Sequence, residues 1–111
     1  MKKTRSRTAL SNDLEFGRSV LRAESAALRA VLRRMGREFV LAVERIHACD
    51  GDVVVTGVGK SGLIGQKISA TLASTGTPSI YLHSAEALHG DVGRVRRTDL
   101  VLMATVVVGI A

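Results

Sequence analysis

A lysine and a serine stand in a glycine-rich segment that directly follows an apolar run. The run is Val53–Val55, and the segment behind it reads Thr56-Gly57-Val58-Gly59-Lys60-Ser61-Gly62. Three consecutive β-branched residues predict a strand that is buried on both faces. Where a strand passes through a glycine turn into a helix, unpaired backbone N–H groups stand at the positive end of the helix dipole, and such a place favours phosphate. The segment is therefore a candidate anion-binding loop.

Two nucleotide-binding motifs match this segment only in part. A Walker loop has a glycine five residues before its Gly-Lys-Ser/Thr, whereas that position is occupied by Val54, inside the predicted strand. The glycine spacing matches the dinucleotide fingerprint, but that fingerprint also requires an acidic residue at the end of the second strand. The first acidic residue there is Glu86, in a predicted helix. Because glycines that only pack a helix on a sheet would not explain Lys60, a small phosphorylated ligand fits best.

A second group of polar residues follows the second predicted strand. Glu86 and His89 are three residues apart, so they share one face if the segment is helical. A histidine titrates near neutral pH and can move protons, although His89 could instead cap the helix before Gly90. Ligands bind beyond the C-terminal ends of parallel strands. We therefore expect Gly57–Gly62 and His83–Asp91 to lie at the same edge of the sheet.

The elements that must position these residues alternate between strands and helices. Strands are predicted near 53–56, 79–82 and 100–108, and a helix follows the glycine loop as far as about residues 74–76. Such alternation predicts an α/β fold with a parallel sheet and flanking helices.

Two amphipathic helices are predicted before the first strand. Asn12 and Glu15 resemble a capping box that opens the first helix, and Gly36 interrupts it. The second helix ends at Asp50-Gly51, where the glycine is expected to adopt a positive φ. The spacing of the apolar residues in the first helix could serve a partner helix, but we expect both helices to pack on the sheet. That apolar stripe consists of Leu14, Leu21, Leu28, Val31, Leu32 and Met35.

Composition and charge narrow the class of protein. A chain of 111 residues with 46% apolar residues forms at most one domain with a core of its own. The net charge is +6, and much of it lies in residues 1–9, which we expect to be a disordered basic tail. No aromatic residues lie among these charges, so no nucleic-acid partner is expected. No signal peptide or membrane-length apolar run is present, and the single Cys49 predicts neither an internal disulfide nor a zinc site.

Three segments occur in the order and spacing of a known family. They are Val53–Gly62, Ala73–Pro78 and Glu86–Asp91, and from about Leu14 to Met103 the chain resembles the sugar isomerase (SIS) domain. Within that family it most resembles the D-arabinose-5-phosphate isomerases, which supply synthesis of the lipopolysaccharide sugar Kdo. The resemblance implies a flavodoxin-like fold and a cytoplasmic aldose–ketose isomerase that interconverts arabinose 5-phosphate and ribulose 5-phosphate through an enediol. It also implies a pentose phosphate substrate and a homo-oligomer (usually a tetramer). No membrane partner, cofactor or metal ligand is predicted from the residues.

The resemblance assigns roles to particular residues. Lys60 and His89 match the active-site lysine and histidine of the family and are the expected catalytic residues. Ser61 matches the loop hydroxyl that lies near the substrate. A non-catalytic sugar-phosphate-binding or regulatory SIS module is the alternative function, and a nucleic-acid-binding protein with a basic arm is a third. The expected substrate-binding residues are Gly57, Gly59, Ser61, Gly62 and Glu86.

The sequence departs from the family after the third strand. The family has a Ser-x-Ser-Gly-Glu-Ser/Thr loop there that holds the phosphate, whereas this chain reads Ala104–Ala111. The later strands of the family, and the CBS modules of its longer members, are also missing. We therefore expect residues 10–111 to be an incomplete, N-terminal part of a SIS domain that is inactive by itself. A premature end, a shifted reading frame or a deliberately shortened chain would each explain the departure.

Overall fold

A computed structural model describes residue 4 and residues 6–105 of the chain. The chain divides into two compact units, with the boundary between Phe39 and Val40, and each is described here by itself. The predicted extension of the third strand to residue 108 lies partly outside the described residues. Among the described residues, no helix combines the length and the apolar composition that crossing a membrane requires.

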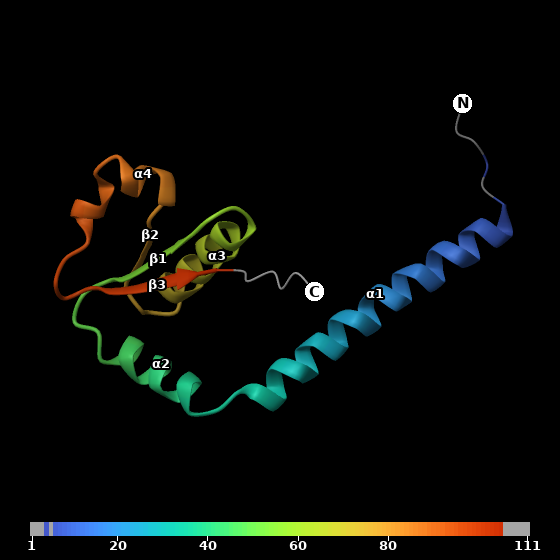
Figure 1. The fold of residues 1–111 in the computed structure, drawn as a ribbon, viewed down its shortest axis with the longest axis horizontal. Coiled ribbons are helices and arrows are strands. Elements are labelled where there is room, and N and C mark those ends of the chain that lie inside the picture. The colour runs from blue at the N-terminus through green and yellow to red at the C-terminus, as the bar shows by residue number, and fades with distance from the viewer. Residues whose placement is uncertain (1–3, 5, 106–111) are drawn as a thin grey trace, which may run out of the picture. The chain divides into compact units, whose positions relative to one another are not determined.

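The first unit is built on one long helix, α1 (Arg7–Arg34) (Figure 1). Its N-cap is Ser6, whose side-chain oxygen accepts a hydrogen bond of 3.2 Å from the N–H of Ala9. A serine cap satisfies one of the free N–H groups of the first turn, so the helix begins five residues before Asn12. The predicted capping box is therefore wrong, and residues 7–9 of the predicted disordered tail are helical.

The apolar stripe of α1 has no cover within its own unit. None of the helix's residues is buried, and Leu28 and Leu32 of the stripe are about 72% and 69% exposed. The next helix, α2 (Arg37–His47), has no buried residue either. A single amphipathic helix cannot bury its own apolar face. The packing of these two helices on the sheet stays a prediction.

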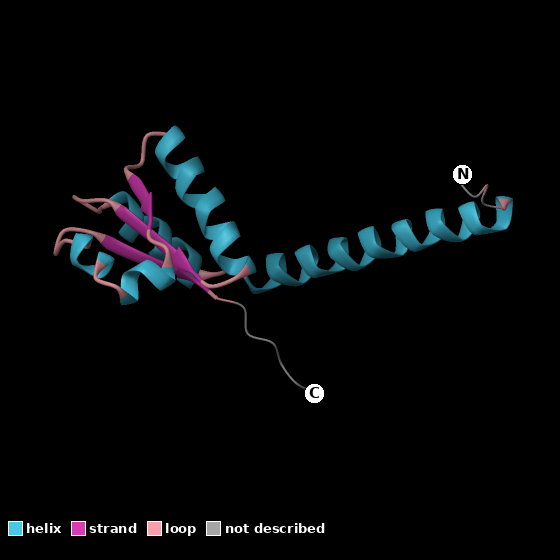
Figure 2. Cartoon of the chain, turned by 90° about the horizontal axis from the view of Figure 1, so that it is seen from above, coloured by secondary structure: helices cyan, strands magenta, loops and turns pink. Residues whose placement is uncertain are grey.

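The second unit contains a parallel sheet of three strands, as the sequence predicts (Figure 1; Figure 2). β1 (Val53–Gly57) lies in the centre and pairs in parallel with β2 (Ser79–Tyr81) and with β3 (Leu100–Ala104). The side chains of Val53–Val55 are fully buried. Successive residues of a strand point to opposite faces, so burial of all three valines means that both faces of β1 are covered at these positions, which is why its apolar residues do not alternate with polar ones.

A helix of small residues packs against this sheet. It is α3 (Lys60–Ser74), and a Cβ added at Gly65 would lie 3.2 Å from Cγ1 of Val55, so the helix backbone approaches β1 closely. Farther along the helix the buried Ser69 shares a hydrogen bond of 2.8 Å with the hydroxyl of Ser79. The Ser79 hydroxyl also donates to the carbonyl of Val53 at 2.7 Å. Two hydroxyls therefore connect the helix to β2 and β1.

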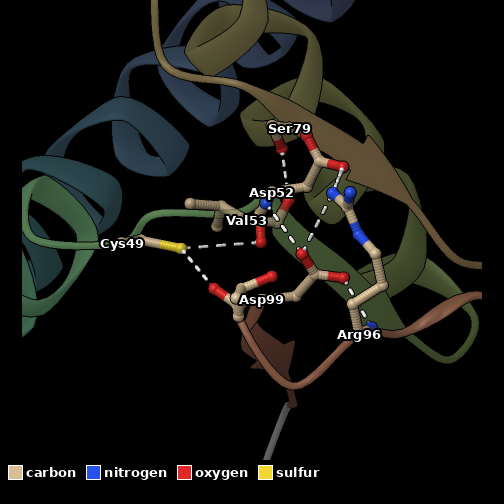
Figure 3. Close-up of polar contacts among 7 residues, drawn as sticks. Cys49, Asp52, Val53, Ser79, Arg96 and Asp99 are labelled. Carbon is tan, nitrogen blue, oxygen red and sulfur yellow. Dashed lines mark hydrogen bonds and ion pairs between the residues drawn. The ribbon is translucent and has the colours of Figure 1, made fainter.

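Charged side chains form a cluster at the end of the sheet where the strands begin (Figure 3). The carboxylate of Asp99, only 1% exposed, accepts hydrogen bonds from the N–H groups of Asp52 and Arg96 at 2.9 and 2.7 Å. The Arg96 guanidinium lies 2.8 Å from the Asp52 carboxylate and 3.3 Å from that of Asp99. The backbone N–H of Arg96, followed by that of Asp52, lowers the pKa of Asp99 because both stabilise the charged carboxylate.

Gly51 lies beside this cluster, and the positive φ predicted for it is wrong. Its φ is not positive, so it is not the left-handed helix cap expected from the sequence. A Cβ at Gly51 would instead lie 2.7 Å from the carbonyl oxygen of Thr98. Glycine is required there because two backbone segments approach closely. The thiol of Cys49 points into the same region and donates to the carbonyl of Thr98 at 3.5 Å.

Two short helical segments connect β2 to β3. The first is α4 (Ser84–Leu88), and the second is the 3₁₀ helix η1 (Asp91–Arg94). Gly90 joins them with φ of 114°, a conformation that favours glycine. The short helix predicted around Glu86 is therefore present.

Candidate functional site

A cavity of about 510 Å³ opens where β1 and β3 end. In a parallel α/β sheet this is the edge at which ligands bind, so the cavity lies where the topology predicts a site. Backbone and side chains from the ends of both strands, from the start of α3 and from the start of α4 form its wall. The lining residues are Thr56, Gly57, Val58, Lys60, Ser61, Ser84, Met103, Ala104 and Thr105.

The glycine loop gives one wall of the cavity its anion-binding character. Gly59 is the N-cap of α3 with φ of 60° and ψ of −130°, a conformation that a residue with a side chain rarely adopts. No side chain caps this helix within the described chain. The N–H groups of Gly62 and Leu63 donate to the carbonyl of Gly59. Those of Lys60 and Ser61, by contrast, precede the hydrogen bonds of the helix and stand at the cavity wall. These two N–H groups are available to a ligand that accepts hydrogen bonds.

Lys60 places a positive charge at the same end of the helix. It is exposed and lines the cavity, and within residues 6–105 no carboxylate forms an ion pair with it. A cation at a helix N-terminus is repelled by the dipole, which costs stability. The charge and the dipole together favour an anion in the cavity. Ser61, only 8% exposed, adds a hydroxyl directly behind the lysine.

Ser84 brings the second loop to the same cavity. It is the first residue of α4, whose N-cap His83 accepts a hydrogen bond of 3.3 Å at Nδ1 from the N–H of Ala85. The sequence analysis did not single out Ser84, nor the hydroxyls of Thr56 and Thr105 that line the cavity from β1 and from the residue after β3. All three come at or just beyond the end of a parallel strand, and that position was the signal that could have found them.

The residues expected from the sequence fall into three groups. Gly57, Lys60 and Ser61 line the cavity together. Gly59 and Gly62 shape the loop without lining it. Glu86 and His89 are exposed on and after α4 and do not line it either.

His89 ends α4. Its backbone N–H donates to the carbonyl of Glu86 at 3.0 Å, as expected of a helix cap. Its catalytic role therefore stays a prediction. Among the described residues, no group of three or more histidine, cysteine, aspartate or glutamate side chains could hold a metal ion.

Comparison with known proteins gives related isomerases. The SIS domain family matches residues 46–106. The probable arabinose 5-phosphate isomerase of Haemophilus influenzae is 47% identical over 92 residues, which cover 83% of this chain and 27% of that protein. Arabinose 5-phosphate isomerase GutQ of Escherichia coli is 51% identical over 89 residues, covering 80% of this chain and 28% of that enzyme. The chain thus spans less than a third of the length of these curated relatives.

Solved structures agree with the sequence relatives. An Escherichia coli protein in complex with arabinose 5-phosphate superposes with a TM-score of 0.80 at 38% identity, covering 89% of this chain and 51% of that one. A sugar-phosphate isomerase candidate from Listeria monocytogenes superposes with a TM-score of 0.76 at 24% identity, covering 90% and 51%, and shows the fold alone. Because the family matches more than half of the chain, with the glycine loop and the parallel sheet inside the matched residues, this protein belongs to the SIS domain family.

Proposed function

We propose that these residues form part of the sugar-phosphate site of an aldose–ketose isomerase that interconverts D-arabinose 5-phosphate and D-ribulose 5-phosphate. The observation that carries the proposal is the position of Lys60 and the uncapped start of α3 at the cavity, in a chain related to arabinose 5-phosphate isomerases. The arabinose 5-phosphate complex of the similar Escherichia coli protein supports the same substrate class.

Each lining group has a role in this chemistry. Aldose–ketose isomerisation removes a proton from the carbon next to the carbonyl, and negative charge then develops on the carbonyl oxygen. The ammonium of Lys60, which lines the cavity, would neutralise that charge. The Ser61 hydroxyl and the N–H groups at the start of α3 would hold phosphate oxygens. Glu86 and His89 remain our candidates for substrate binding and proton transfer, through a rearrangement of α4 or in a larger assembly.

We propose that the 111 residues by themselves bind sugar phosphate without turning it over. Lys60 is the single titratable side chain among the described residues that line the cavity, so no positioned base faces a substrate. A positioned acid or base typically contributes about 10²–10⁴-fold to the rate. The same observation favours the second candidate function, a sugar-phosphate-binding module without catalysis. Turnover separates the two candidates once the chain is studied with the rest of a SIS domain.

The related proteins are longer than this chain, which bears on its domain organisation. The chain covers 51% of the similar Escherichia coli structure, and we propose that residues 10–111 are the N-terminal part of a larger SIS domain. We also propose that the chain forms homo-oligomers, as the relationship to the SIS family suggests, and that the apolar stripe of α1, which is not covered within its own unit, contributes to them. Sedimentation of the wild-type chain and of Leu28→Glu tests this: the variant is expected to sediment as the smaller species. Equal sedimentation of the two would contradict a role for the stripe.

Binding is tested by titrating the chain with arabinose 5-phosphate while backbone amide resonances are followed. The amides at the start of α3 are expected to shift, and arabinose without phosphate serves as the ligand control. Lys60→Ala is expected to weaken binding by about tenfold or more, as for the loss of a charge-assisted contact. Lys67→Ala, on the same helix but away from the cavity, is the matched control. No shift with arabinose 5-phosphate, or equal affinity in Lys60→Ala, would contradict the proposal.

A turnover assay tests the proposal that the chain binds sugar phosphate without converting it. The purified chain is expected to produce no ribulose 5-phosphate above background from arabinose 5-phosphate. Measurable turnover that is lost in Lys60→Ala or in His89→Ala would show that the described residues already hold the required base.

A further inference from the structure

Tyr81 contacts three segments around the cavity, the glycine loop, α3 and the N-cap of α4, yet it does not line the cavity itself. It is the last residue of β2, half-buried, and pairs with Val55 of the central strand. The sequence analysis assigned it no role, and neither does the chemistry proposed above.

The hydroxyl of Tyr81 reaches the glycine loop. It donates a hydrogen bond of 3.2 Å to the carbonyl oxygen of Gly57, the residue at which β1 ends. A Cβ at Gly62 would lie 2.7 Å from the same hydroxyl oxygen. The hydroxyl therefore sits between the beginning and the end of the loop, in contact with both.

The ring of Tyr81 contacts two further segments. A Cβ at Gly65 would lie 3.3 Å from Cε2 of the ring, so α3 packs directly on it. On another side the ring meets the imidazole of His83 edge to face, with centroids 6.4 Å apart and planes at 87°. His83 is the N-cap of α4, and the next residue, Ser84, lines the cavity. One side chain thus joins the glycine loop, α3 and the start of α4.

We propose that Tyr81 is a positioning residue that holds the Gly57–Gly62 loop against the start of α4, so that Lys60 and Ser84 face one cavity. Packing alone would be served by phenylalanine, and the hydroxyl adds a hydrogen bond to a carbonyl of the loop. A loop held in its binding conformation loses less conformational entropy when a ligand binds. The expected effect on sugar-phosphate affinity rests on the proposed function. The effect of Tyr81 on the conformation of the loop is tested without a ligand.

Amide hydrogen exchange of wild-type chain and of Tyr81→Phe measures that hold. The reporters are the N–H groups of Gly62 and Leu63, which both donate to the carbonyl of Gly59. The reference N–H groups are those of Val53 and Leu82, which bond to Pro78 and Val55 in the sheet. Loss of one hydrogen bond is expected to speed exchange of the reporters about two- to tenfold while the references stay unchanged.

The matched control is Ser79→Ala, which removes a hydroxyl two residues earlier on the same strand. That hydroxyl contacts Ser69 and the carbonyl of Val53, far along the strand from the loop. Its loss is expected to leave the reporters at the wild-type rate relative to the references. Unchanged reporters in Tyr81→Phe would overturn the proposal, and so would equal acceleration of reporters and references, or acceleration of the reporters by Ser79→Ala.

Gly62→Ala gives an independent approach to the same contact if Tyr81→Phe does not yield folded protein. The added Cβ would meet both the hydroxyl of Tyr81 and the carbonyl oxygen of Gly57, the donor and the acceptor of the proposed hydrogen bond, so the Leu63 amide is expected to exchange faster; a wild-type rate would overturn the proposal. In the ligand arm, Tyr81→Phe is expected to weaken arabinose 5-phosphate binding about two- to tenfold at an unchanged melting temperature. If the wild-type chain itself binds no arabinose 5-phosphate, the proposed function fails for this chain, and the exchange rates still decide whether Tyr81 holds the loop.

Discussion

The two ends of the three-stranded sheet are built from opposite kinds of contact. Where the strands begin, the carboxylate of Asp99 is buried and bonded to two N–H groups, with the guanidinium of Arg96 beside it. Where the strands end, the exposed charge of Lys60 stands at an uncapped helix terminus without an ion-pair partner in the described chain. Satisfied groups stabilise a fold, whereas groups left without partners are available to a ligand. The comparison assigns stability to one end and binding to the other.

Substitution of Gly51 is expected to break the stabilising end most strongly. In Gly51→Ala the new methyl group meets the carbonyl of Thr98 and the Asp99 side chain, so backbone must move. We expect a loss of about 1–3 kcal/mol in the free energy of unfolding, as for other overpacked sites. Urea unfolding measures it, and Gly93→Ala, where an added Cβ meets nothing within 4 Å, is the control. Equal stability of the two variants would contradict the close approach at Gly51.

Acid is expected to weaken the same end through Asp99. Because the pKa of this carboxyl is lower in the folded chain than in the unfolded one, its contribution to stability is complete above the unfolded pKa of about 4 and is lost as the pH falls through the folded pKa. Asp99→Asn should therefore be less stable than wild type at neutral pH, and the difference should shrink in acid. Unfolding free energies across this pH range test the sign. Asp91→Asn, at a partly exposed carboxylate of η1, serves as the control.

The binding end is expected to respond in the opposite direction. Lys60→Ala removes a cation from the N-terminus of α3, so the free energy of unfolding should rise by about 0.3–1 kcal/mol while sugar-phosphate affinity falls. Thermal unfolding of the variant, with Lys67→Ala as the control, measures the change. A destabilised Lys60→Ala would mean that the lysine supports the fold, and the contrast between the two ends would then fail.

Much of the fold could be predicted from local pattern. Three adjacent valines predict a strand buried on both faces, and the strand order of a parallel α/β sheet places the glycine loop at its ligand-binding edge. The start of α1 was missed because Ser6 and Asn12 are both residues that cap helices, and the sequence does not say which one the chain uses. The reason for Gly51 was missed because glycine serves left-handed caps and close approaches alike.

The sequence by itself determined the features that depend on residues adjacent in the chain. These are the buried strand, the parallel class of the sheet, the Gly-Lys-Ser loop and the family. Tertiary structure alone decided which side chains meet. Arg96 reaches Asp52 across 44 residues, and Tyr81 reaches the carbonyl of Gly57 across 24. Periodicity records whether a residue is buried, but such contacts depend on the register of the strands and on the loops that follow them. For that physical reason the contacts of Tyr81 could not be predicted before β2 was paired with β1.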